Sequence, residues 1–226
     1  MITSAANPRL KLVRRLQSRR QRAKLGLFVC EGEDLVDAAL AAGLEPADLL
    51  VAGEAVVPEL LAAVSELPHP PRVVGVFRRA DLPAFRPGGT CLGVWHVSDP
   101  GNVGTLIRCA DAFGASVALS AGCADPTGGK ALRASAGAIF RVPVGRLDQV
   151  TGRRIALVPR GGRPLAELDL GEAVTFVLGA ERAGLPEEVL ATCDERATIP
   201  LAASAESLNV AVAGAIALYE LSRGRG

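Results

Sequence analysis

Histidines and paired cysteines, the usual ligands of zinc, are scarce in this chain of 226 residues. Its two histidines, His69 and His96, are far apart in the sequence. Its five cysteines are an odd number and form no Cys-x-x-Cys pair, so they indicate neither a zinc site nor a disulfide framework. We expect no metal, and we expect most cysteines to pack as small hydrophobic side chains. An activated thiolate at Cys109, beside Arg108, is the alternative.

Long apolar runs are also missing. A membrane helix needs roughly 20 apolar residues, whereas the longest candidate, residues 210–219, is about half that length and is followed by Glu220. The beginning of the chain is basic and lacks the apolar segment of a signal peptide. We therefore expect no membrane partner and a cytoplasmic protein.

Acidic side chains are absent before Glu31, although this part of the chain carries eight arginines and lysines. A basic arm of this kind is typical of proteins that bind a polyanion, most often a nucleic acid. A solvated helix face is the alternative. We expect one helix over residues 7–24, with apolar side chains on one face and arginines on the others. The candidate nucleic-acid-binding residues are Arg9, Arg14, Arg15, Arg19, Arg20 and Arg22.

Strand and helix patterns alternate along the chain, which predicts an α/β protein. Residues 82–90 contain two prolines and two glycines and mark the best boundary. We expect a small α/β domain over residues 1–86 and a second domain over residues 90–226. The strands of the second domain are nearly continuous apolar runs, as in a parallel sheet covered on both faces. Its expected strands cover 91–97, 116–120, 153–159, 175–181 and 196–201, and its helices include 99–114, 128–139 and 207–223.

Three loops follow expected strands of the second domain, where ligands of parallel sheets bind. Residues 98–104 lead into an apolar helix that contains one strong cation, Arg108, and an arginine is rarely buried without a partner. Residues 179–186 hold an acid, which suits a ligand with hydroxyls or a positive charge better than a phosphate. Residues 199–209 end in Ser207, Leu208 and Asn209. Taken singly, these loops are also compatible with an ordinary turn and a helix cap.

Taken together, the three loops are specific. The segments DPGNVGTLIRCADAFG, LGAERAGL and IPLAASAESLNVAVAGAIALYEL resemble, in this order and spacing, the three motifs of the SpoU (TrmH-like) RNA ribose methyltransferases of the SPOUT superfamily. Residues 7–40 are similar to the small RNA-binding domain that many members carry. The resemblance implies a parallel sheet with a deep trefoil knot, S-adenosylmethionine as the cofactor, a homodimer with sites near its interface, and methyl transfer to a ribose 2′-hydroxyl of RNA.

The motif match also implies the site residues. Ala180 and Ala203 depart from the usual pattern, because many members have Asn or Ser at the first position and Gly at the second. Both are small, so we expect the cofactor pocket to persist. The implied catalytic positions are Arg108, Asn102, Glu181, Ser207 and Asn209. The implied cofactor contacts come from Leu157, Val158, Pro159, Leu178, Gly179, Ala180, Ile199, Leu201 and Leu208.

The chemistry of methyl transfer gives Arg108 a role. A ribose hydroxyl is a poor nucleophile while it keeps its proton. A guanidinium holds its own proton too tightly to be an ordinary base, but it can bind the neighbouring phosphate and stabilise a developing alkoxide. We expect Arg108 to act either as a base assisted by the phosphate or as an electrostatic stabiliser. We expect Asn102 to hold Arg108 or the ribose, and Ser207 and Asn209 to orient the hydroxyl and the loop.

Other functions compete with this interpretation. The alternative is a catalytically inactive RNA-binding protein of the same fold, which would have lost Arg108, Asn102 or Asn209. A dinucleotide-dependent oxidoreductase is disfavoured, because no G-x-G-x-x-G follows a first strand. The two-domain form favours 23S ribosomal RNA over transfer RNA as the substrate.

Overall fold

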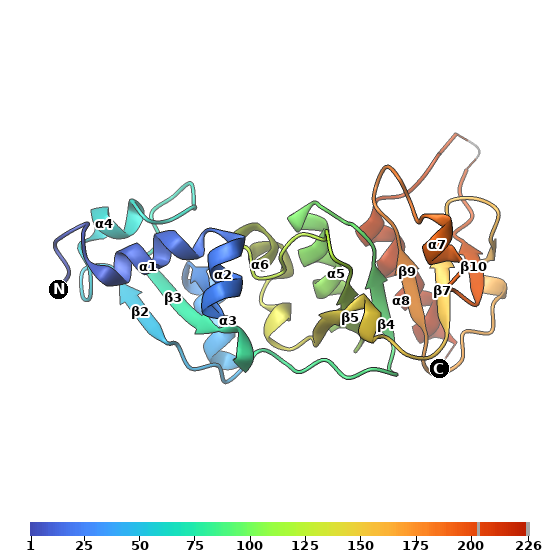
Figure 1. Cartoon of the computed structure of the whole chain (residues 1–226), viewed down its shortest axis with the longest axis horizontal. Helices are drawn as coiled ribbons and strands as arrows, with labels where there is room; N and C mark the ends of the chain where they lie inside the picture. Colours follow the sequence, from blue (N-terminus) through green and yellow to red (C-terminus); the bar gives the residue numbers. More distant parts are fainter. Residues whose placement is uncertain (203, 225–226) are drawn as a thin grey trace.

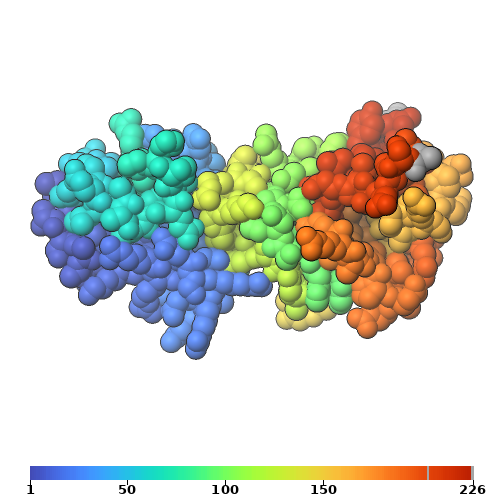
Figure 2. All heavy atoms as spheres, turned by 90° about the horizontal axis from the view of Figure 1, so that it is seen from above, coloured from blue at the N-terminus to red at the C-terminus, as the bar shows by residue number. Residues whose placement is uncertain are grey.

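A computed structural model describes residues 1–202 and 204–224, so Ala203 lies outside the described residues. Figure 1 shows an elongated molecule with the N-terminal elements at one end and the C-terminal elements at the other. In the space-filling view of Figure 2, the yellow-green segment near residue 130 lies against the N-terminal half. The division at residues 86 and 90 stays a proposal, and residues 82–90 hold neither a helix nor a strand.

The N-terminal half is built on a sheet of three antiparallel strands in the order β1-β3-β2. The helix α1 buries Leu10, Val13 and Leu16 against it, in a cluster with Leu50 and Val74. Each such side chain contributes about 1.5–3 kcal/mol when it leaves water. The elements are α1 (Pro8–Leu16), α2 (Arg19–Leu25), β1 (Leu27–Glu31), α3 (Glu33–Ala41), β2 (Asp48–Val51), α4 (Pro58–Ala62), β3 (Val73–Arg78) and the short helix η1 (Arg79–Asp81).

The single helix expected over residues 7–24 is two helices, so that expectation is wrong. The first ends at Leu16, and Ser18 has an extended backbone before the second begins. The break frees the carbonyl oxygens of Leu16 and Gln17, and each accepts a hydrogen bond of 2.8 Å from the Arg22 guanidinium. Helix propensity alone favours one continuous helix through Ser18, but the contacts of Arg22 stabilise the turn between α1 and α2.

The C-terminal half contains seven parallel strands in the order β6-β5-β4-β9-β7-β10-β8. This confirms the predicted α/β class and the parallel sheet. The chain passes from β7 to the edge strand β8, back to β9 beside β4, and out again to β10. The deep trefoil knot stays a prediction of the resemblance. The elements are β4 (Cys91–Val94), α5 (Pro100–Ala112), β5 (Ser116–Leu119), α6 (Gly129–Ser135), η2 (Ala138–Phe140), β6 (Val144–Arg146), η3 (Leu147–Gln149), β7 (Arg154–Leu157), β8 (Arg163–Pro164), η4 (Leu165–Glu167), β9 (Thr175–Leu178), α7 (Glu187–Leu190), β10 (Glu195–Thr198) and α8 (Val210–Arg223).

Two strands of this sheet escaped the sequence patterns. β6 has three residues and β8 has two, and they form the two edges of the sheet. β8 also contains Pro164, which lacks the N–H group that an inner strand needs. Strands this short contain too few buried side chains to form a recognisable apolar run in the sequence.

Close helix packing positions α5 over the sheet. A Cβ at Gly104 of α5 would lie 2.3 Å from the carbonyl oxygen of Ala131 in α6. A Cβ at Gly214 of α8 would lie 2.6 Å from the side chain of Leu106 in α5. Both glycines therefore allow backbones to approach where a larger residue would separate them. As a result, α5 is held between α6 and α8, and its N-terminus is fixed at the carboxyl end of β4.

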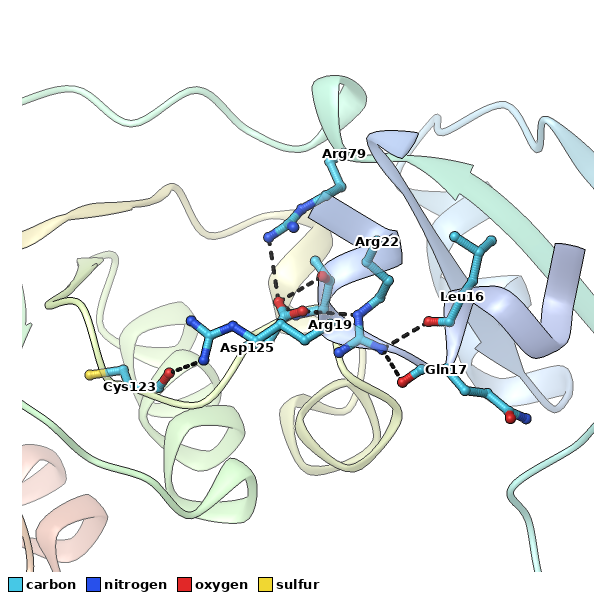
Figure 3. A network of polar contacts seen from close by, with 8 residues as sticks. Leu16, Gln17, Arg19, Arg22, Arg79, Cys123 and Asp125 are labelled. Carbon is cyan, nitrogen blue, oxygen red and sulfur yellow. Dashed lines mark hydrogen bonds and ion pairs between the residues drawn. The ribbon is translucent and has the colours of Figure 1, made fainter. Parts of the chain in front are cut away.

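The two halves share an apolar contact and a buried ion pair. Phe28 of β1 stacks on Phe140, with ring centroids 6.4 Å apart. The loop after β5 presents Asp125, whose Oδ2 atom lies 2.9 Å from Nε of Arg22 in α2, and the two side chains are only 6% and 9% exposed. Arg79 approaches the other carboxylate oxygen at 3.4 Å (Figure 3). The Asp125 carboxylate therefore joins the loop after β5 to two arginines of the N-terminal half.

The environment of Asp125 favours its charged form. Burial alone would raise the pKa of Asp125, but hydrogen bonds from the backbone and hydroxyl of Thr127 and from Arg22, together with the Arg22 charge, outweigh burial and lower it below its ordinary 3.8. A lowered pKa in the folded state contributes stability that is present at neutral pH and is lost as the pH falls through it. The contact between the halves therefore weakens in acid.

We expect Asp125→Asn to lower the free energy of unfolding by about 3–5 kcal/mol at pH 7, because it leaves the Arg22 guanidinium buried without its charge partner. Denaturant unfolding at pH 7 and pH 3 measures this, and the loss should shrink at the lower pH. Glu33→Gln is the control, because Glu33 pairs with Arg72 across 3.5 Å on the surface and such pairs contribute at most about 1 kcal/mol. Equal effects of the two substitutions would contradict the assignment.

Candidate active site

A pocket of about 540 Å³ lies at the carboxyl edge of the second sheet. Its walls are the ends of β7 and β9, the segment after β10, and the first turns of α8. The nine residues implied for the cofactor all line this pocket, although their role in binding stays a prediction. They are Leu157, Val158, Pro159, Leu178, Gly179, Ala180, Ile199, Leu201 and Leu208.

The segment after β9 folds back on itself because Gly179 has no side chain. A Cβ at Gly179 would lie 2.3 Å from the carbonyl carbon of Gly184. Gly184 has a φ of +65° and forms an isolated bridge with Ala180, a backbone conformation that favours glycine. This tight loop holds Glu181 and Arg182 where both line the pocket.

A chain of side-chain hydrogen bonds joins the three motif loops. Nδ2 of Asn209 donates to Oδ1 of Asn102 at 3.0 Å, and Nδ2 of Asn102 donates to Oε1 of Glu181 at 2.7 Å. Oδ1 of Asn209 accepts from the backbone N–H groups of Ala211 and Val212 at 2.9 and 3.3 Å. Asn209 is therefore the N-cap of α8 and a link in the chain. The structure brings together three residues that are distant in sequence.

The helix expected over residues 207–223 begins at Val210 instead. Ser207 therefore precedes the helix, where it is exposed and lines the pocket. The cap of this helix is Asn209 and not Ser207, because the side-chain oxygen of Asn209 accepts from the backbone N–H groups of the first helical turn.

Asp99 fixes the start of α5 and with it Asn102. Its carboxylate accepts from the backbone N–H groups of Gly101 and Asn102 at 2.6 and 3.2 Å, and from Nζ of Lys130 at 3.1 Å. The hydrogen bond from Lys130 lowers the pKa of Asp99, and the backbone hydrogen bonds add to this effect. The charged cap holds Asn102 in the first turn of α5, facing the other two loops.

Arg108 lies on the solvent side of α5, so this largely apolar helix has one exposed face. Arg108 shares an exposed stripe with Thr105 and Ala112. Within the described part of the chain, it forms no hydrogen bond or ion pair. Asn102 lies six positions earlier, about 9 Å along the helix axis. Unlike Glu181 and Ser207, Arg108 is not in the pocket wall, and its guanidinium is free to bind a ligand or partner.

The cysteines behave as packing residues. All five are free thiols. Burial raises the pKa of Cys109, and the nearby Arg108 offsets this only in part. The thiol therefore stays protonated at neutral pH, and the structure favours packing over an activated thiolate at Cys109.

Neither a metal-binding cluster nor a membrane-spanning helix is present among the described residues. Over residues 1–202 and 204–224, no cluster of three histidine, cysteine or acidic side chains is placed to hold a metal ion. In the same stretch, every helix is too short or too polar to cross a bilayer.

Sequence patterns missed part of the pocket wall. Arg182, Leu185, Glu206, Val210 and Ala213 also line it. All five lie in or directly after the second and third motif segments, so proximity to the motifs was the available signal. Their side-chain directions depend on the fold-back of the loop after β9 and on where α8 begins, and neither is visible in a sequence pattern.

The fold defines an α/β protein with two sheets and a pocket at the carboxyl edge of the parallel one. Residues 90–219 match the family model of the SpoU rRNA Methylase family, and residues 7–76 match that of the MRM3-like substrate binding domain. The chain belongs to the SpoU family of RNA ribose methyltransferases, as its three motifs predicted.

Relatives and solved structures agree over nearly the whole chain. The 23S rRNA (guanosine(2553)-2′-O)-methyltransferase of Bacillus subtilis is 32% identical over 97% of this chain and 98% of its own length. The crystal structure of an AdoMet-bound rRNA methyltransferase from Sinorhizobium meliloti has a TM-score of 0.87 and 30% identity, and the match covers 99% of this chain and 97% of that one. The SpoU methyltransferase AviRb from Streptomyces viridochromogenes, in complex with AdoMet, has a TM-score of 0.86 and 28% identity over 97% and 98% of the two chains.

Two substitutions separate the roles of Asn209. We expect Asn209→Ala to lower the free energy of unfolding by about 1 kcal/mol, because α8 loses its cap. Asn209→Asp keeps both cap acceptors but cannot donate to Asn102, so its stability should stay near that of the parent. Rotation of the Asn102 amide by a half turn cannot restore both hydrogen bonds. In the Asn209→Asp variant its two neighbours, the new carboxylate and Glu181, are both acceptors.

Methyl transfer should fall in both variants if the hydrogen-bonded chain orients the site. The measurement is a thermal unfolding curve and a methylation rate for each protein. A parental rate in Asn209→Asp would mean that Asn209 is only a helix cap.

Proposed function

We propose that this protein transfers a methyl group from S-adenosylmethionine to a ribose 2′-hydroxyl of 23S ribosomal RNA. The observation that carries the proposal is the convergence of the three motif loops on one pocket at the carboxyl edge of the parallel sheet. Relatives that modify 23S rRNA, and similar structures that hold AdoMet, support it. A ribosomal substrate agrees with a cytoplasmic protein.

The pocket residues fit the proposed cofactor. Leu157, Leu178 and Leu201 offer apolar surface, and the backbone of the loop after β9 offers polar groups close by. Glu181 and Glu206 also line the pocket and would favour a positively charged ligand. The bound cofactor supplies an activated methyl group on a positively charged sulfur. The protein then has to position the ribose and assist the loss of its proton.

Arg108 would act on the ribose and its phosphate. Its guanidinium is exposed and without a protein partner among the described residues, so it is available to bind a phosphate through two parallel hydrogen bonds. From there it would stabilise negative charge that develops on the attacking oxygen. Asn102, held by Asn209 and Glu181, would orient the ribose. In this scheme Arg108 is a stabiliser, because a guanidinium is a poor base.

A homodimer formed through α8 would place a second copy of the chain near Arg108. Val212 and Tyr219 of α8 are 47% and 53% exposed and lie on one face of the helix, two turns apart. Large apolar side chains on one helix face favour contact with another protein surface. α8 packs on α5, which carries Arg108. A second copy on this face would bring its own chain close to the site.

The basic N-terminal arm would supply affinity for RNA through its exposed arginines. Arg14, Arg15 and Arg20 are exposed and without a carboxylate partner among the described residues. Arg22, in contrast, is buried against Asp125, and Arg9 pairs with Asp48 and also donates to the Leu49 carbonyl at 3.0 Å. Arg22 is therefore not free to bind a phosphate in this structure, and Arg9 is a weaker candidate than the three exposed arginines.

Arg108→Ala tests the catalytic assignment. We expect methyl transfer to fall by about 10² to 10³, the scale for loss of one preorganised charge stabiliser, while affinity for S-adenosylmethionine stays near the parental value. Arg108→Lys should recover little, because an ammonium group cannot make the paired contact. Single-turnover methylation and calorimetry measure the two effects.

Arg72→Ala is the control, because Arg72 is exposed on the N-terminal half and, among the described residues, pairs only with Glu33. A folded Arg108→Ala protein with the parental rate would refute the assignment. A parent protein that binds cofactor and RNA but methylates none would favour the inactive RNA-binding alternative.

Replacing Arg14, Arg15 and Arg20 with Gln tests the arm. Arginine–phosphate contacts release counterions, so RNA binding by the parent should weaken steeply with salt. The triple variant should flatten the plot of log affinity against log salt by about 0.7 to 0.9 for each lost contact and raise the KM for RNA. Filter binding over a range of salt concentrations measures the slope, and an unchanged slope would mean that the arm is a solvated surface.

A further inference from the structure

A second cavity lies where the two halves meet, and the proposed function does not use it. It has a volume of about 940 Å³ and shares no wall residue with the cofactor pocket. We call it the junction groove. Arg19 and Arg79 line it from the N-terminal half, and Trp95, Arg146 and Arg154 line it from the C-terminal half. Part of its remaining wall comes from α7, which contributes Glu188 and Val189.

One aromatic side chain of the groove wall, Trp95, is held in position by a neighbour outside the wall. Trp95, the only tryptophan of the chain, is partly exposed and stacks on His96, with ring centroids 4.6 Å apart and planes 16° apart. His96 has a φ of +52°, which is uncommon for a residue with a side chain. Its backbone N–H donates to Oγ of Ser120 at 2.9 Å, and its ring packs against Gly122. Backbone strain of this kind persists only where the surroundings enforce it.

Trp95 also links the groove to the cofactor pocket. It directly follows β4, and its backbone N–H donates to the carbonyl oxygen of Leu178 at 2.8 Å. Leu178 lines the cofactor pocket, whereas Trp95 lines the groove. The groove and the cofactor pocket therefore border the hydrogen-bonded ends of the neighbouring strands β4 and β9.

The charge of the groove suits a polyanion. Guanidinium N–H groups of Arg19 and Arg154 donate to the backbone carbonyls of Cys123 and Val150 at 2.9 and 2.7 Å (Arg19 is drawn in Figure 3). Over the described residues, neither arginine has a carboxylate partner, so both keep an uncompensated positive charge.

Other charges in the groove nearly cancel. Arg79 shares the carboxylate of Asp125 with Arg22, which leaves one positive charge for that trio. Arg146 is paired with Asp148, and Glu188 contributes one negative charge. The positive excess therefore comes from Arg19 and Arg154, which are held on backbone carbonyls from the two sides of the junction.

We propose that the junction groove binds a single-stranded segment of the RNA substrate beside the methylated nucleotide. One base would stack on the Trp95 indole, which His96 supports from outside the groove wall, and phosphates would bind Arg19 and Arg154. Aromatic side chains next to positive charge are the usual way to hold an unpaired base and its backbone. A duplex keeps its bases stacked inside and cannot use the Trp95 indole. The proposal rests on the proposed function for the identity of the RNA, but not for the binding itself.

The fluorescence of Trp95 tests this directly, because no other tryptophan contributes to the emission. The full-length protein is titrated with a short single-stranded oligoribonucleotide, with a blunt RNA duplex of the same sequence, and with inorganic polyphosphate, which carries no bases. We expect saturable quenching by the single strand and little by the other two. Equal quenching by polyphosphate, or binding of the single strand without quenching, would overturn the proposal.

Substitutions give a second readout. Trp95→Leu should weaken binding of the single strand about tenfold to a hundredfold by fluorescence anisotropy, and Trp95→Phe should recover most of it. The pair Arg19→Gln and Arg154→Gln should weaken binding and flatten its salt dependence, whereas the control Arg72→Gln should not. Calorimetry with S-adenosylmethionine monitors the cofactor pocket, and a parental RNA affinity in Trp95→Leu would overturn the proposal.

The two proposals fail in different ways. Quenching by RNA in a protein that methylates no RNA would refute the methyltransferase function and support the groove. Methyl transfer by a protein whose Trp95 emission and variants do not respond to RNA would refute the groove and leave the function intact.

Discussion

The parallel direction of all seven strands in the larger sheet is the constraint on which the rest of this protein depends. Parallel strands end at the same edge, so segments that leave β4, β9 and β10 meet there although β4 ends at Val94 and β10 begins only at Glu195. That meeting produces the apolar pocket and the chain from Asn209 through Asn102 to Glu181. It also places Trp95, which directly follows β4, between the pocket and the junction groove.

The arginines of this chain have different roles, and the burial of each side chain distinguishes one role from another. Arg22 is part of the buried contact between the halves, where it satisfies Asp125 and two carbonyl groups freed by the break between α1 and α2. Arg14 and Arg20 point into solvent on the same arm. One basic segment therefore both fixes the orientation of the halves and presents a charged surface. A count of charges cannot distinguish these roles, because each depends on the partner that the fold supplies.

The site is assembled with little buried charge. Glu181, Ser207 and Arg108 are exposed, and the polar chain that joins the loops runs through two neutral amides. A methyl donor that is already activated requires orientation more than strong acid or base groups. An open arrangement of amides, carboxylates and the exposed guanidinium of Arg108 agrees with that requirement, because the substrate itself would bring the phosphate that completes it.

The sequence by itself determined the α/β class, the parallel sheet, the three motif loops and the family. Apolar periodicity and motif residues are local properties of the sequence, so they can be identified without knowledge of contacts between distant residues. The edge strands β6 and β8, the break before α2, the start of α8 at Val210 and the exposure of Arg108 were decided by the tertiary structure. The break before α2 and the start of α8 each depend on a partner distant in sequence, Asp125 for Arg22 and Asn102 for Asn209. Such contacts are worth more than the small propensity differences that a sequence pattern can register.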